Sequence, residues 1–232
     1  MSSILTSLAT TFIDANDNMA RGQFISFEGS EGCGKSTQIF LLEERLRKER
    51  GVEILRTREP GGTIIGEHVR DLLQHTEGVE NMTSECEMFL FAASRSQLVR
   101  EKISPALDAG TWVIADRFVD STTIYQGIGR GLGIEKLNTV SGIAVGETMP
   151  DITILLDMDA AVGHARAVAT SAGEGPDRME NQPIEFFETV RAGYLDLAKN
   201  NPDRIIVINA AQSIDEVADD LWSAIETRFD FS

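Results

Sequence analysis

The residues with the clearest chemical potential lie between positions 29 and 36 and read Gly-Ser-Glu-Gly-Cys-Gly-Lys-Ser. This pattern is typical of a loop that wraps a phosphate group, because glycines let backbone N–H groups converge and a following helix adds positive potential at its start. Within it, Lys35 is expected to bridge the β- and γ-phosphates of a nucleotide and Ser36 to ligate Mg²⁺. The predicted phosphate-binding residues are Gly29, Ser30, Glu31, Gly32, Cys33, Gly34, Lys35, Ser36 and Thr37.

A second candidate is Asp116, which ends the apolar run Thr-Trp-Val-Ile-Ala. An acid in this place can reach the metal of a bound nucleotide, although strands often end in Asp for structural reasons alone. The strings D-x-x-G and N-K-x-D, expected of a GTPase switch, do not occur in the sequence. A phosphate loop without them favours a kinase over a guanine-nucleotide switch.

The elements that must position these residues follow from the hydrophobic pattern. Five short apolar or β-branched segments are expected to be strands, at residues 23–28, 52–57, 111–115, 152–156 and 205–208. Helical stretches separate them, which predicts an α/β fold: a parallel sheet covered on both faces, with ligands at the carboxyl ends of its strands.

Several boundaries can be predicted from the sequence. The first helix should end near Arg50, stopped by Gly51, with Ile39, Leu42 and Leu46 on one face. The pairs Ser84 with Glu87, and Ser213 with Glu216, are typical of capping boxes that open helices. Residues 170–177, rich in helix breakers, predict a mobile loop.

Composition limits the function further. A formal charge of −16 argues against a nucleic-acid binder, so an anionic substrate must meet locally concentrated arginines. Two cysteines are too few for a disulfide framework and fit a reducing cytoplasm, and no apolar stretch is long enough to cross a membrane. Residues 1–21 lack the basic start of a signal peptide and are expected to form a disordered extension.

Five segments together resemble bacterial thymidylate kinase: FEGSEGCGKST, TREPGGT, LFAASR, DRF and YQGIGRGLG, in this order. The resemblance runs from Gly22 to nearly the C-terminus, which implies one kinase domain over residues 22–232. It also implies the P-loop nucleoside monophosphate kinase fold with a five-stranded parallel sheet and a mobile lid. ATP with Mg²⁺ and dTMP as substrates, and a homodimer, are further expectations from the family.

The resemblance also gives roles to individual side chains. Phe91 and Arg95 are four residues apart on a predicted helix and share a face, so Phe91 would stack on thymine while Arg95 donates to a thymine carbonyl. Core packing for Phe91 and a surface ion pair for Arg95 are the structural alternatives. The remaining expected substrate-binding residues are Arg58 and Arg117 for the acceptor phosphate, Thr122 and Gln126 for the base, and Tyr125 for the sugar.

The expected catalytic residues are Lys35, Arg117, Glu31, Arg166 and Arg178. Arg166 and Arg178 flank the predicted lid, although Arg166 alone could equally be a solvated helix residue. Glu31 could orient metal-bound water or the acceptor sugar, or only accept from amides of its own loop. Two other functions stay open: a kinase for another nucleoside monophosphate such as UMP or CMP, and a non-catalytic nucleotide-binding regulator.

Overall fold

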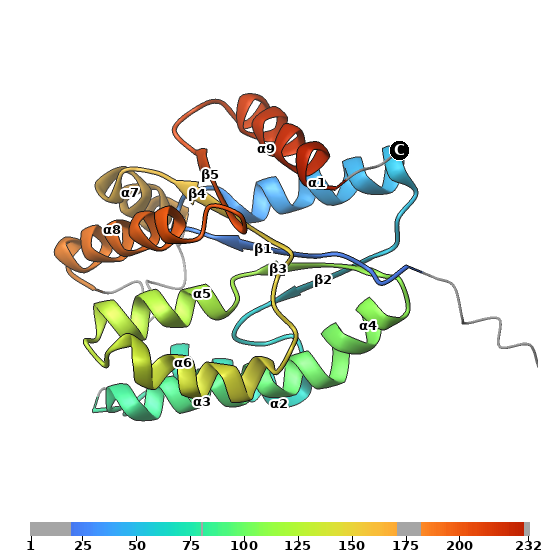
Figure 1. Cartoon of the computed structure of the whole chain (residues 1–232). Coiled ribbons are helices and arrows are strands. Elements are labelled where there is room, and N and C mark those ends of the chain that lie inside the picture. The colour runs from blue at the N-terminus through green and yellow to red at the C-terminus, as the bar shows by residue number, and fades with distance from the viewer. Residues whose placement is uncertain (1–19, 80, 171–181, 230–232) are drawn as a thin grey trace, which may run out of the picture.

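In the computed structural model, residues 20–79, 81–170 and 182–229 are described. Five parallel strands form one sheet in the order β2-β3-β1-β4-β5 (Figure 1). Their bounds are Phe24–Glu28 (β1), Ile54–Arg58 (β2), Trp112–Asp116 (β3), Ile152–Asp157 (β4) and Ile205–Asn209 (β5). All five predicted strands, and the parallel α/β sheet, are confirmed.

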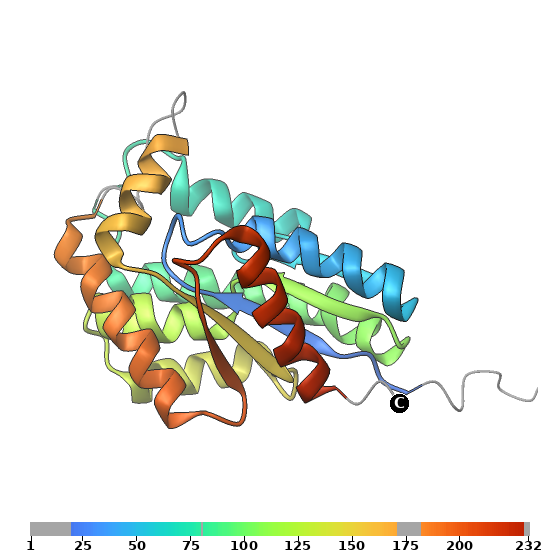
Figure 2. The ribbon, with the colours of Figure 1, turned by 90° about the horizontal axis from the view of Figure 1, so that it is seen from above.

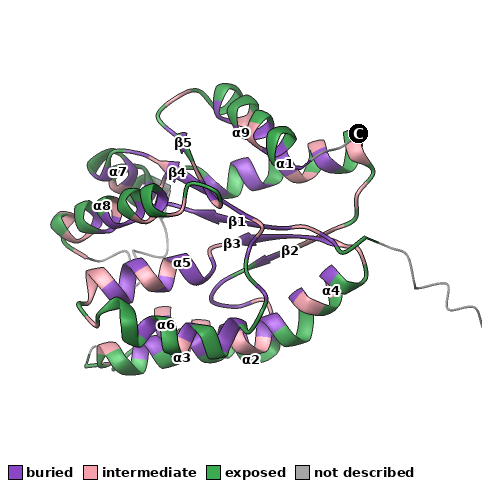
Figure 3. Ribbon diagram, viewed as in Figure 1, coloured by how far each residue is buried: buried purple, intermediate pink, exposed green. Residues whose placement is uncertain are grey.

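Helices cover both faces of this sheet. Their bounds are Lys35–Arg50 (α1), Ile64–Gln74 (α2), Ser84–Leu98 (α3), Ser104–Asp108 (α4), Val119–Thr122 (α5), Ile134–Val145 (α6), Ala160–Thr170 (α7), Ile184–Asn200 (α8) and Ile214–Arg228 (α9), with π-helical segments Val99–Ile103 (η1) and Thr123–Gly129 (η2). α1 and α9 lie side by side on one face, and α3, α4 and α6 lie on the other (Figures 1 and 2). Burial is concentrated in the strands between these layers (Figure 3).

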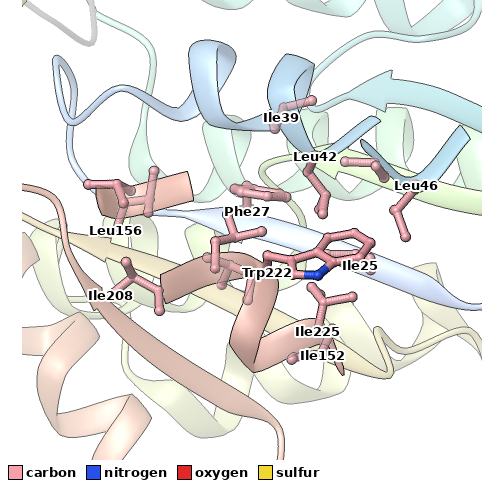
Figure 4. Packing of buried hydrophobic residues seen from close by; sticks show 14 of the residues in the cluster. Ile25, Phe27, Ile39, Leu42, Leu46, Ile152, Leu156, Ile208, Trp222 and Ile225 are labelled. Atoms are coloured by element: carbon pink, nitrogen blue, oxygen red, sulfur yellow. The ribbon is translucent and has the colours of Figure 1, made fainter. Parts of the chain in front are cut away.

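The larger hydrophobic cluster lies between the sheet and the α1–α9 pair. Ile39, Leu42 and Leu46 of α1 belong to the same buried cluster as Trp222 and Ile225 of α9 (Figure 4). This confirms the apolar face that was predicted for the first helix. Gly51 ends α1 in the left-handed conformation, with a φ of 64°, as expected of a helix stop signal.

The two predicted capping boxes have different outcomes. Ser213 and Glu216 form the predicted reciprocal pair at the start of α9. The box predicted from Ser84 and Glu87 is wrong, because the N-cap of α3 is Thr83, whose side chain accepts from the N–H of Cys86. Glu87 is instead almost completely buried.

Two predictions fall mainly on residues that the structure does not describe. The extension at residues 1–21 is described only from residue 20, and the loop predicted at residues 170–177 is described only at Thr170, where α7 ends. Both stay predictions, as does the mobile lid. Within the described ranges, no helix is long and apolar enough to cross a membrane.

The capping box at the start of α9 is expected to stabilise the fold, and this can be tested by mutation. Ser213→Ala removes the oxygen that accepts from the Glu216 N–H and should lower the free energy of unfolding by about 1 kcal/mol. The matched control is Ser223→Ala, since Ser223 is exposed within the same helix and its hydroxyl donates to the Asp219 carbonyl rather than capping the helix. Urea titration measures both variants, and equal losses would contradict a specific contribution from the cap.

Candidate active site

A cavity of about 200 Å³ opens at the edge where the strands β1, β2 and β3 end. The register explains why residues from three loops meet there: Asp116 at the end of β3 lies beside Phe27 of β1 and Arg58 of β2. Nine residues predicted from the sequence line the cavity, namely Glu31, Lys35, Arg58, Phe91, Asp116, Arg117, Thr122, Tyr125 and Gln126. Glu59, Pro60, Arg70, Gln74 and Ser121 also line it and were not predicted.

The glycine loop joins β1 to α1 and holds Lys35 at one end of the cavity. Its glycines at positions 29, 32 and 34 have φ angles of 136°, 70° and 90°, a region that residues with a side chain rarely adopt. The ammonium of Lys35 donates to the carbonyl of Ser30 at 2.9 Å and to that of Gly29 at 3.2 Å. The lysine is therefore held over the loop rather than extended into solvent.

A second loop, after β3, is fixed by the buried carboxylate of Glu28. Glu28 accepts from the N–H groups of Phe118 and Ser121 at 2.9 and 3.2 Å, and from the Ser121 hydroxyl at 2.6 Å. The hydroxyl of Tyr194 on α8 donates to the same carboxylate at 2.7 Å. Burial raises the pKa of Glu28 above its ordinary value, and the negative charge of Asp120 acts in the same direction. These four donors offset the cost of burying the group.

Arg117 begins the loop after β3, and its side chain bonds to the glycine loop. Its backbone has a φ of 67°, which is uncommon for a residue other than glycine and is often found at functional positions. Its Nη2 donates to Glu31 Oε1 at 2.7 Å, and the Tyr125 hydroxyl donates to the same carboxylate at 3.0 and 3.1 Å. Glu31 thus accepts from these two side chains and, within the described residues, from no amide of its own loop.

Phe91 lies half-buried in the cavity wall, whereas Arg95, four residues further along α3, is not one of the residues that line the cavity. The alternative of a surface ion pair for Arg95 is wrong, since its side chain is 1% exposed and Nε donates to Glu59 Oε2 at 2.8 Å. Nη2 donates to Thr122 Oγ1 at 2.7 Å. Burial raises the pKa of Glu59 to about 7, although the charge of Arg95 acts in the opposite direction.

The sequence matches the family model described as thymidylate kinase over residues 27–221. The chain belongs to the thymidylate kinase family. A thymidylate kinase of Caldanaerobacter subterraneus subsp. tengcongensis is 47% identical over 206 residues, 89% of this chain and 96% of that protein. One of Rhodopseudomonas palustris is 42% identical over 208 residues, 90% of each chain.

A solved structure agrees with these relatives. The crystal structure of thymidylate kinase from Ehrlichia chaffeensis superposes with a TM-score of 0.72 and 34% identity, covering 88% of this chain and 99% of that one. The P-loop nucleoside monophosphate kinase fold expected from the resemblance is therefore confirmed.

Not every residue expected from the thymidylate kinase resemblance reaches the cavity. Ser36 and Thr37 are exposed at the start of α1, next to Lys35, and are not part of the cavity wall. Arg166 is exposed on α7 and also does not line it. Arg178 lies outside the described residues.

α7 nevertheless packs against the glycine loop of this thymidylate kinase family member. A Cβ built on Gly163 would lie 2.7 Å from the carbonyl oxygen of Glu31, and one on Gly32 would lie 2.0 Å from the carbonyl of Gly163. Two glycines are thus required for the helix and the loop to approach this closely.

Gly163→Ala tests this contact. The added methyl should push α7 away from the loop and lower the free energy of unfolding by about 1–3 kcal/mol. The control is Gly142→Ala in α6, where a Cβ would meet nothing within 4 Å and helix propensity should raise stability by about 0.5–1 kcal/mol. Chemical denaturation gives the free energy of unfolding of both variants. A higher value for Gly163→Ala than for the wild type would contradict the close packing of α7 against the glycine loop.

Proposed function

We propose that this chain transfers the γ-phosphoryl group of ATP to dTMP, giving ADP and dTDP. One observation carries the proposal: a single cavity is lined by Lys35 of the phosphate loop and by the acceptor-side residues Phe91, Arg117 and Gln126. A donor phosphate at one end and a nucleoside monophosphate at the other would meet within it. Membership of the thymidylate kinase family supports dTMP as the acceptor.

On the donor side, the loop amides and Lys35 would hold the β- and γ-phosphates. Ser36 at the start of α1 and Asp116 at the end of β3 offer oxygen ligands of the kind that Mg²⁺ prefers. Within the described residues, no three acidic, histidine or cysteine side chains cluster as a metal cage. This donor set fits a metal held mainly by substrate phosphates, where it would neutralise charge on the transferring group.

On the acceptor side, Arg58 and Arg117 would hold the dTMP phosphate, because guanidinium groups match phosphate oxygens. Phe91 would stack on the base, an interaction worth roughly 1–3 kcal/mol. Arg95, Thr122 and Gln126 would bond to its polar edge.

The reaction needs positioning more than proton transfer. The acceptor is a phosphate oxygen that is already ionised near neutral pH, so no general base is required. Lys35, Arg117 and Glu31 border the place where the two phosphates would meet, with Glu31 fixing Arg117 through their 2.7 Å ion pair. Arg166 or Arg178 would add a lid arginine that compensates charge in the reacting complex.

A homodimer is part of the same proposal. Phe89 on α3 and Ile143 on α6 expose 58% and 72% of their surface on adjacent helices. A second copy of the chain would cover these apolar side chains. Sedimentation equilibrium measures the assembly state.

The substrate is tested by ADP formation in a coupled assay with dTMP, dUMP, UMP and CMP as acceptors. The highest kcat/KM with dTMP is expected, because Phe91, Arg95 and Gln126 are suited to a thymine edge. A preference for UMP or CMP would favour the kinase alternative, and no ADP with any acceptor would favour the nucleotide-binding regulator.

Lys35→Ala should lower kcat by about 10²-fold or more, because a preorganised charge at the transferring group is lost. Lys48→Ala is the control, since Lys48 is exposed in the last turn of the same helix. Circular dichroism should show both variants folded. A kcat close to that of the wild type in Lys35→Ala would contradict the assignment of residues 29–36 as the phosphate-binding loop.

Tyr125 is expected to select deoxyribose. A rigid ring against the sugar 2′ carbon would leave the 2′ hydroxyl of a ribonucleotide without room and without a hydrogen-bond partner. We expect this to disfavour the ribonucleotide by roughly a few kcal/mol. Tyr125→Ala should therefore narrow the gap in kcat/KM between dTMP and ribothymidine monophosphate. Tyr125→Phe should keep the gap, since it removes only the hydroxyl that donates to Glu31. Equal losses for both nucleotides would mean that the sugar is selected elsewhere.

A further inference from the structure

Two buried carboxylates, one in the cavity wall and one behind it, each bond to a side chain that is expected to contact the base. The first is Glu59, which accepts from Arg95 Nε at 2.8 Å. Because Arg95 Nη2 is also occupied, by Thr122 Oγ1 at 2.7 Å, only Nη1 is left over. Nη1 is buried and has no hydrogen-bond partner among the described residues. A buried guanidinium N–H without an acceptor indicates a donor that is kept for a ligand.

The second carboxylate is Glu87, which is 1% exposed. It accepts from Gln126 Nε2 at 2.8 Å and from Arg130 Nε at 3.4 Å. An ionised carboxylate only accepts hydrogen bonds, so the amide nitrogen of Gln126 must face Glu87 and its carbonyl oxygen must face the other way. Gln126 lines the cavity, and its Oε1 bonds to no other described residue. Arg95 does not itself line the cavity, but its Nη2 bonds to Thr122, which does and which precedes Gln126 by four residues. The unpaired donor of Arg95 therefore lies behind the part of the wall that carries the Gln126 acceptor.

We propose that Glu59 and Glu87 determine base specificity as positioning residues: they fix a donor on Arg95 beside an acceptor on Gln126. This inference rests on the proposed function, with a nucleoside monophosphate as acceptor. An imide base such as thymine or uracil presents the complementary order, a carbonyl acceptor beside a ring N–H donor. Cytosine presents an amino donor and a ring acceptor, which is the reverse order.

Glu87 is the more informative of the two residues. The two ends of a glutamine amide have nearly the same shape, so the cavity could hold Gln126 in either orientation. The carboxylate of Glu87 decides between them. In Glu87→Gln the new amide can either donate or accept, which removes that choice without changing the volume.

The test is kcat/KM for dTMP, dUMP and dCMP in the full chain. Glu87→Gln should reduce the ratio of kcat/KM for dTMP to that for dCMP by roughly tenfold, mainly by raising KM for dTMP. In the variant Gln126 can flip, and its amide N–H would then face the ring N–H of thymine, so that two donors meet without an acceptor. The dTMP-to-dUMP ratio should not change, since those two bases share the imide edge and differ by one methyl group. Glu85→Gln removes an equal charge from an exposed position in the same helix turn and should leave every ratio unchanged.

Glu59→Gln is the second variant and keeps the test decisive if Glu87→Gln does not fold. It should also reduce the dTMP-to-dCMP ratio, measured at a pH of about 8 where Glu59 is ionised. An unchanged dTMP-to-dCMP ratio in a folded variant overturns the proposal, and so does an equal fall in the dTMP-to-dUMP ratio, which would indicate a loosened cavity. Failure of the proposed function is distinct, because the wild-type chain would then not phosphorylate dTMP at all.

Discussion

The geometry of the cavity depends on one buried carboxylate, that of Glu28 at the end of the central strand. Its four hydrogen bonds come from the loop after β3 and from α8. A buried carboxylate without these donors would be costly, so the partners are constrained to stay where they are. The left-handed backbone of Arg117 is held next to this network, with Nη1 3.2 Å from the Ser121 hydroxyl. The position of Arg117 in the cavity wall thus follows from where Glu28 is buried.

The same principle reconciles a strongly acidic chain with anionic substrates. Each of three cavity-side arginines has its own carboxylate: Arg117 with Glu31, Arg95 with Glu59, and Arg58 with Glu67. The first two pairs are buried enough to act as fixed dipoles that orient the guanidinium group, whereas the exposed Arg58 pair contributes little energy. A formal charge of −16 is therefore compatible with binding of anionic substrates. Three of the carboxylates near the cavity are paired with arginines, and the two buried ones orient the guanidinium groups.

The sequence predicted the sheet well because the three central strands, β1, β3 and β4, are short apolar runs that are buried on both faces. It predicted the glycine loop and most of the cavity wall because those residues lie in compact motifs. It failed where the partner is distant in the chain. Glu28 bonds to residues 90, 93 and 166 positions away, and no local pattern marks such an acid. The cap of α3 is Thr83 rather than the predicted Ser84. Both residues carry a hydroxyl that can cap a helix, and only the backbone conformation decides between them.

The strand order explains why donor and acceptor groups share one cavity. β1 lies between β3 and β4, so the phosphate loop after β1 is adjacent to the loop after β3, and β2 on the far side of β3 brings Arg58 and Glu59 to the same edge. The chain after β3 then forms α5 and the π-helical η2, on which Thr122 and Gln126 are four residues apart and share a face. π-helical turns are rare and concentrate at functional sites. A single continuous segment, from Asp116 to Gln126, thereby supplies three cavity-lining side chains to which we give the proposed metal, phosphate and base roles, and the pairing of β3 fixes where that segment begins.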